Sequence, residues 1–150
     1  MALERSLWQR VRTGWAVLRK LGHKIVLSRI ENLVDEGTPD VEGCIAGVHI
    51  WLELKSCDRP VRPSTPIRFR TNKKTYISQT LWHRERAAAG CRHNFVLIQV
   101  GDASQAKLYL IPGYYYDKLK VPEIDLELMS VLSYSNASMA DILLRAAQGW

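Results

Sequence analysis

The stretch of sequence that decides the fold is Val48-His49-Ile50-Trp51-Leu52-Glu53-Leu54-Lys55. Aliphatic residues occupy every second position, which is the period of a β-strand with one buried face. The opposite face ends with Glu53 and Lys55, which project on the same side because they are two residues apart. A salt bridge at a solvated sheet face is the ordinary explanation for such a pair. A metal site is the other, because a carboxylate binds a hard divalent cation and a nearby ammonium group stabilises charge on a phosphate.

A second carboxylate for such a site is supplied by Asp40, at the end of the turn Gly37-Thr38-Pro39-Asp40. If residues 40–43 begin one strand and residues 48–55 form its hairpin partner, Asp40 and Glu53 meet at one end of the pair. Turn residues of this kind are common, so Asp40 alone carries little information. Asp40, Glu53 and Lys55 together predict a catalytic metal site.

The patterns on both sides of this strand predict one α/β domain over residues 1–150, with a central mixed β-sheet flanked by helices. Apolar residues at steps of three and four indicate an amphipathic helix from Leu3 to about Gly22. The other expected elements are a strand within His23–Asn32, an irregular loop over Arg59–Thr75, a helix over Tyr76–Ala89, strands at Phe95–Val100 and Lys107–Ile111, a short helix at Tyr115–Leu119, and a last helix at about Ala137–Ala147 capped by Asn136 or Ser135. The contribution of residues 119–150 is left open between completing the fold, forming a dimer interface and contacting a partner.

Positive charge is concentrated directly after the strand that carries Lys55. The chain has a net charge of +6, and six basic residues lie between positions 59 and 74 with no acid among them. A solvated loop explains this stretch as well as a loop that neutralises phosphates does. The candidate nucleic-acid contacts are Arg59, Arg62, Arg68, Arg70, Lys73 and Lys74.

The sequence resembles a known nuclease superfamily. Gly37-Thr38-Pro39-Asp40 followed by Glu53-Leu54-Lys55 is similar to the PD-(D/E)XK signature. Ser78-Gln79, with Trp82 and Gly90, resembles the glutamine-bearing helix of VRR-NUC nucleases and phage junction resolvases. Over residues 3–111, this resemblance implies a restriction-endonuclease-like core.

The resemblance also implies a set of site residues. Asp40, Glu53 and the Leu54 carbonyl would bind Mg²⁺, with Mn²⁺ as a substitute, and Lys55 and Gln79 would complete the catalytic set. Glu4 resembles the acid on the first helix of many such nucleases, where it would assist the metal site; this role is favoured over the alternative, in which Glu4 caps the helix start. Glu31 is its rival for that role.

On the second long helix, the family resemblance places His83 and Arg86 toward the DNA. A general-base role for His83 is left open. Tyr114-Tyr115-Tyr116 could stack on bases, but packing against the sheet is favoured.

The implied activity is hydrolysis of DNA phosphodiesters by a structure-selective endonuclease of the Holliday-junction resolvase type. The alternatives are a VRR-NUC-type flap, end or nicking nuclease, and a non-catalytic basic nucleic-acid-binding domain. The implied partners are branched DNA and a second copy of the chain. No apolar run approaches the ~20 residues of a membrane span, and the first residues do not form a signal peptide. A cytoplasmic location is expected, which would be the host cytoplasm for a phage protein.

Overall fold

The computed structural model describes residues 2–30, 37, 39–102, 106–135 and 138–150. Six strands form one mixed sheet in the order β1-β2-β3-β4-β5-β6, and β3 with β4 is the parallel pair among antiparallel neighbours. In chain order the elements are α1 (Ala2–Lys20), β1 (Ile25–Arg29), β2 (Val41–Ile45), β3 (Val48–Cys57), α2 (Lys73–Ala88), β4 (Asn94–Val100), β5 (Lys107–Pro112), the 3₁₀ helix η1 (Gly113–Lys118), α3 (Glu123–Met129), β6 (Leu132–Ser135) and α4 (Met139–Gln148).

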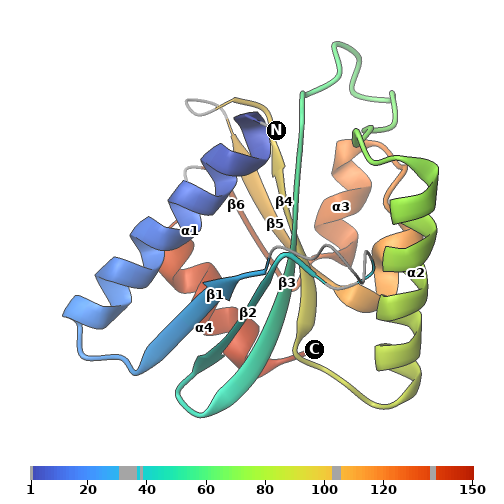
Figure 1. Ribbon diagram of the computed structural model, residues 1–150. Coiled ribbons are helices and arrows are strands. Elements are labelled where there is room, and N and C mark those ends of the chain that lie inside the picture. Colours follow the sequence, from blue (N-terminus) through green and yellow to red (C-terminus); the bar gives the residue numbers. More distant parts are fainter. Residues whose placement is uncertain (1, 31–36, 38, 103–105, 136–137) are drawn as a thin grey trace.

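Helices cover both faces of the sheet (Figure 1). On one face α1 and α4 pack together over β3, and on the other lie α2, η1 and α3. Alternate strand residues supply the two cores, as the pleat requires. Leu52 and Leu54 belong to the core beneath α1 and α4, whereas Val96 and Ile98 of β4 belong to the core on the opposite face. The predicted α/β class with a central mixed sheet flanked by helices is confirmed, and this arrangement agrees with the expected restriction-endonuclease-like core.

The β2–β3 hairpin positions the candidate site. Ala46 and Gly47 connect the strands, both with positive φ (51° and 85°), as a tight two-residue hairpin turn requires. Val41 is the first residue of β2 and is paired with Leu52 of β3. Asp40 directly precedes Val41, so it lies beside the part of β3 that carries Glu53. The predicted hairpin and the predicted alternation of β3 are therefore both confirmed.

Several boundaries differ from the expectations. The helix expected at Tyr76 begins at Lys73, because the side chain of Asn72 accepts a hydrogen bond from the Thr75 N–H (2.8 Å) and caps it. The last helix begins at Met139 and is capped by Ser138, so neither Asn136 nor Ser135 is its cap; Asn136 itself lies outside the described residues.

The segment after Pro112 contains two unexpected elements. Helix α3 was not predicted, and neither was β6, which extends the sheet by pairing with β5. Because α4 also packs against α1, the described part of residues 119–150 completes the fold, which is one of the three contributions that the sequence left open. Among the described helices, none combines the length and apolarity that a membrane span needs.

Candidate active site

Lys55 is buried in the middle of the protein. Its side chain is 4% exposed, and its Nζ donates hydrogen bonds to Thr71 Oγ1 (2.8 Å) and Gln79 Oε1 (3.1 Å). The Tyr116 ring lies 5.8 Å from the same Nζ. Burying a lysine is costly unless its donors are satisfied, so β3, the loop before α2, and α2 all contribute to holding this ammonium group.

Asp40 reaches the same strand from the hairpin side. Its Oδ2 accepts a hydrogen bond from the Leu54 N–H at 2.8 Å. In an antiparallel ladder, the N–H and C=O of one residue point to the same edge of the strand. The Leu54 carbonyl is therefore directed to the edge at which Asp40 lies, as the predicted ligand set requires.

Glu53 lies between these two groups along β3. Its side chain has 0% exposure, and its place on the strand face shared with Lys55 directs it toward α2. A fully buried carboxylate requires a cation or hydrogen-bond donors around it. The structure thus brings Asp40, Glu53, Leu54, Lys55 and Gln79 together at one end of the β2–β3 hairpin.

A small pocket opens at this place. It has a volume of about 220 Å³ and is lined by Asp40, Leu54 and Lys55 on one side and by Arg70, Thr71, Asn72, Thr75 and Gln79 on the other. The latter residues form the start of α2 and the loop before it. Since the N-terminal end of a helix carries partial positive charge, the pocket combines an acid with several groups that attract an anion.

Tyr116 is a site residue that sequence reasoning missed. Its hydroxyl donates a short hydrogen bond to Gln79 Oε1, the atom that also accepts from Lys55. Its ring stacks on His83, with centroids 5.0 Å apart. Tyr116 is buried, as expected of a tyrosine that packs, whereas Tyr114 of the same run is 51% exposed and differs from that expectation.

His83 does not point outward as the resemblance implied. It is 1% exposed because α2 turns this side chain toward Tyr116 and Asn94, whose Nδ2 lies 3.5 Å from His83 Nδ1. Burial, then the charges of Lys55 and Arg86, lower the pKa of His83 to about 3. His83 is therefore neutral near pH 7 and poorly suited to act as a general base.

The buried neutral His83 should make stability depend on pH. The unfolded state binds a proton near pH 6.5, whereas the folded state does so only near pH 3, so stability falls as pH decreases through that window. Relative to His83→Gln, we expect the free energy of unfolding of the wild type to fall by about 1.4 kcal/mol for each pH unit between pH 6 and 4. Urea unfolding at several pH values measures the difference; parallel curves for the two proteins would contradict it.

All six basic residues of the loop are exposed, but Arg59 differs from the others in its contacts. Arg59 pairs with Glu123 of α3 (2.7 Å) and donates to the Val100 carbonyl (3.2 Å). The structure thus gives Arg59 a role in fixing the loop to the sheet, and its expected phosphate contact stays a prediction.

The side chains of the two predicted auxiliary acids, Glu4 and Glu31, lie outside the described part of the chain. The backbone of Glu4 belongs to α1, whereas Glu31 lies outside the described residues altogether. Arg86 is half-buried, with its guanidinium 4.4 Å from the Trp82 ring centroid.

No family model matches the sequence, and no curated protein matches it either. Among solved structures, the chain is similar to a Holliday junction resolvase of the archaeal hyperthermophile Archaeoglobus fulgidus, with a TM-score of 0.41 and 12% identity over 89% of this chain and 97% of that one.

Proposed function

We propose that this chain is a metal-dependent DNA endonuclease. Its active site for the hydrolysis of phosphodiester bonds contains Asp40, Glu53 and Lys55. The observation that supports this function most directly is the buried ammonium group of Lys55. It lines a pocket together with Asp40 and lies on the strand face of Glu53. A buried lysine among carboxylates, at the base of an open pocket, is characteristic of a functional site.

The residues present fit a hard divalent cation. Among the described residues, no cluster of three or more His, Cys, Asp or Glu side chains is placed to hold a metal. Mg²⁺ does not need such a cluster, because it commonly binds through one or two carboxylates and keeps several waters. We propose that Asp40, Glu53 and the Leu54 carbonyl hold Mg²⁺, or Mn²⁺ in its place, with Glu4 assisting. When bound, the ion would neutralise charge that develops on the phosphate.

The side chains of the chain itself have separate tasks in this proposal. Lys55 Nζ stabilises negative charge on the phosphate and orients the attacking water. Gln79 holds Lys55 in place through Oε1, which Tyr116 fixes from the other side. Arg70 and the start of α2 line the pocket and attract the phosphate that flanks the scissile bond.

The exposed basic residues would hold the DNA backbone without reading its sequence. Each phosphate contact that is removed reduces the slope of log K against log salt by about one. We expect this reduction for Arg70→Ala and for Lys73→Ala. We expect no change for Lys24→Ala, which removes an exposed charge outside the basic loop. Binding titrations at four salt concentrations, without divalent metal, measure the slopes. If all three variants have the slope of the wild type, the loop does not contact DNA phosphates.

We also propose that branched DNA is the preferred substrate and that the active form is a homodimer. The size of the chain, its basicity and the lack of a recognisable sequence-reading module favour recognition of DNA shape. A Holliday junction has two symmetric strands to cut, which suits two copies of one site. Light scattering of the protein with and without a junction measures the stoichiometry, and a monomer bound to the junction would contradict the dimer.

The experiment that tests the function is cleavage of a labelled four-way junction, a flap and a linear duplex with Mg²⁺. Wild type should cut the junction symmetrically, whereas Asp40→Asn should not cut although it still binds DNA. Asp102→Asn, which neutralises an exposed acid outside the site, is the matched control and should cut normally. Equal rates on all three substrates would exclude the structure-selective activity and favour the nicking alternative, whereas faster cutting of the flap or of the linear duplex would favour the flap or end alternative.

Metal binding needs a measurement of its own. Titration of Mn²⁺ followed by electron paramagnetic resonance should reveal a site in wild type and Asp102→Asn that is weakened at least about tenfold in Asp40→Asn, which loses one charged ligand. DNA binding without any metal site or cleavage would instead establish the non-catalytic binding domain.

A further inference from the structure

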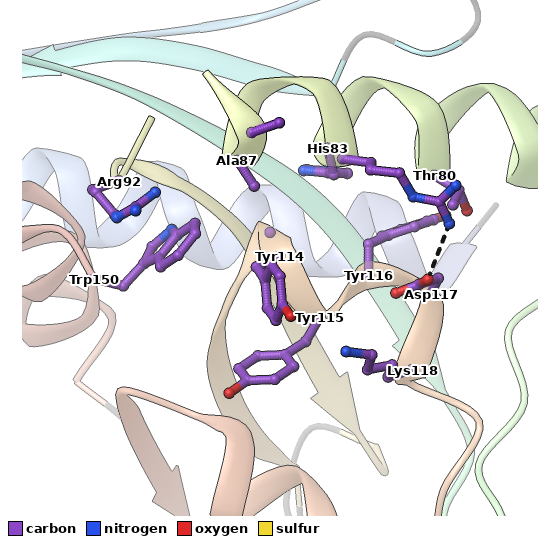
Figure 2. A pocket seen from close by; sticks show the side chains of 13 residues that line it. Thr80, His83, Ala87, Arg92, Tyr114, Tyr115, Tyr116, Asp117, Lys118 and Trp150 are labelled. Atoms are coloured by element: carbon purple, nitrogen blue, oxygen red, sulfur yellow. Dashed lines mark hydrogen bonds and ion pairs between the residues drawn. The ribbon is translucent and has the colours of Figure 1, made fainter. Parts of the chain in front are cut away.

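A larger pocket than that of the candidate active site lies along the C-terminal half of α2, whereas the candidate active site lies toward the start of this helix. It has a volume of about 590 Å³ and is enclosed by the second half of α2, by η1 and by the C-terminal Trp150 (Figure 2). This volume is in the range of sites that bind small molecules. None of Asp40, Glu53 and Lys55 lines it.

Aromatic rings form one wall of this pocket. Tyr114 is 51% exposed and lies 5.1 Å from Tyr115 and 6.2 Å from Trp150, centroid to centroid. Trp150 is held firmly, because its backbone N–H donates to the Arg92 carbonyl (2.8 Å) and its Nε1 donates to the Asn94 carbonyl (2.9 Å). Pre-positioned rings of this kind are suited to stacking on another flat aromatic group.

Positive charge surrounds these rings. Lys118 Nζ lies 4.7 Å from the Tyr114 ring centroid, and the Arg92 guanidinium lies 4.7 Å from that of Trp150. Arg84 also lines the pocket, but it pairs with Asp117 at 3.3 Å. The three cations thus exceed the single acid of the lining, and an anionic ligand is favoured.

We infer that this pocket binds one unstacked nucleotide, with its base on Tyr114 and its phosphate beside Lys118 and Arg92. A flat ring system with an attached anion satisfies the aromatic wall and the excess positive charge together. The inference rests on the proposed function in that an unpaired nucleotide of a branched DNA is the favoured source. A free mononucleotide has the same chemistry.

The test is DNA binding by the whole chain in EDTA, which needs neither metal nor cleavage and so can fail independently of the nuclease activity. The probes are a blunt duplex and the same duplex with a four-nucleotide single-stranded arm. Tyr114→Ala and Lys118→Ala should each weaken binding of the armed duplex about tenfold, as expected for one lost stack or phosphate contact. Binding of the blunt duplex should stay within twofold.

Two controls keep the result specific. Tyr114→Phe retains the ring and should bind the armed duplex as wild type does. Arg29→Ala removes a cation that lies over an aromatic ring elsewhere, at Trp8, and should not distinguish the two probes.

Competition identifies the source of the nucleotide. Loss of arm-dependent binding on addition of dAMP, but not of inorganic phosphate, supports a nucleotide in a DNA strand. Saturable dAMP binding that is lost in Tyr114→Ala, without any effect of the arm, supports a free nucleotide. Equal effects of dAMP and phosphate, or no effect of Tyr114→Ala on either ligand, would overturn the inference.

Discussion

Lys55→Met is expected to reduce the rate of DNA cleavage by about 10²–10³-fold, the usual cost of removing one charge-stabilising donor from an active site. Methionine keeps the length of the side chain but removes the ammonium group that donates to Thr71 and Gln79. Single-turnover cleavage at saturating Mg²⁺ and DNA isolates the chemical step from binding. The DNA affinity should change much less, because the exposed basic loop remains.

Lys24→Met is the matched control, since it makes the same substitution at an exposed position outside the site. Its rate should equal that of wild type. Thermal unfolding of both variants separates a loss of chemistry from a loss of structure. A folded Lys55→Met protein that cleaves within threefold of the wild-type rate would remove Lys55 from the mechanism.

The core of the site could be predicted because it depends on local rules. Glu53 and Lys55 share a face through the two-residue period of a strand, and a tight hairpin brings Asp40 to the same end. The partners of Lys55 and Gln79 depend on tertiary packing instead. Thr71 is 16 residues from Lys55, and Tyr116 is 37 residues from Gln79, so no period within one element connects them.

The elements that were missed have a similar cause. Helix α3 leaves Ile124 and Leu128 exposed, so its apolar residues do not fall on a single buried face. Strand β6 has four residues at the sheet edge, which is too short for an alternating pattern to stand out. The pairing of Arg59 with Glu123 was not predicted, because Glu123 lies 64 residues away and a run of basic residues conceals such a pair.

Substitution of Gly43, at the centre of β2, should have the largest effect on the free energy of unfolding. Gly43 pairs with Leu27 of β1, and a Cβ at this position would lie 2.4 Å from the Val26 carbonyl oxygen and 2.5 Å from Leu27 Cδ2. A backbone oxygen inside a sheet cannot move alone, so Gly43→Ala must push β1 away from β2. We expect a loss of about 1–3 kcal/mol or more in the free energy of unfolding, the usual cost of overpacking, measured by urea denaturation.

This strain should also reach the candidate site. The β1–β2 pairing continues through the Ile30 N–H, which donates to the Asp40 carbonyl at 2.7 Å, so a displaced β1 alters the position of Asp40. Gly47→Ala is the control: it strains a positive-φ residue in the same hairpin but has no atom within 4 Å of the new Cβ. Under conditions in which both variants are folded, Gly43→Ala should cleave DNA more slowly than Gly47→Ala. Equal cleavage rates would mean that Asp40 is held in place by its hydrogen bond to Leu54 rather than by the pairing of β2 with β1.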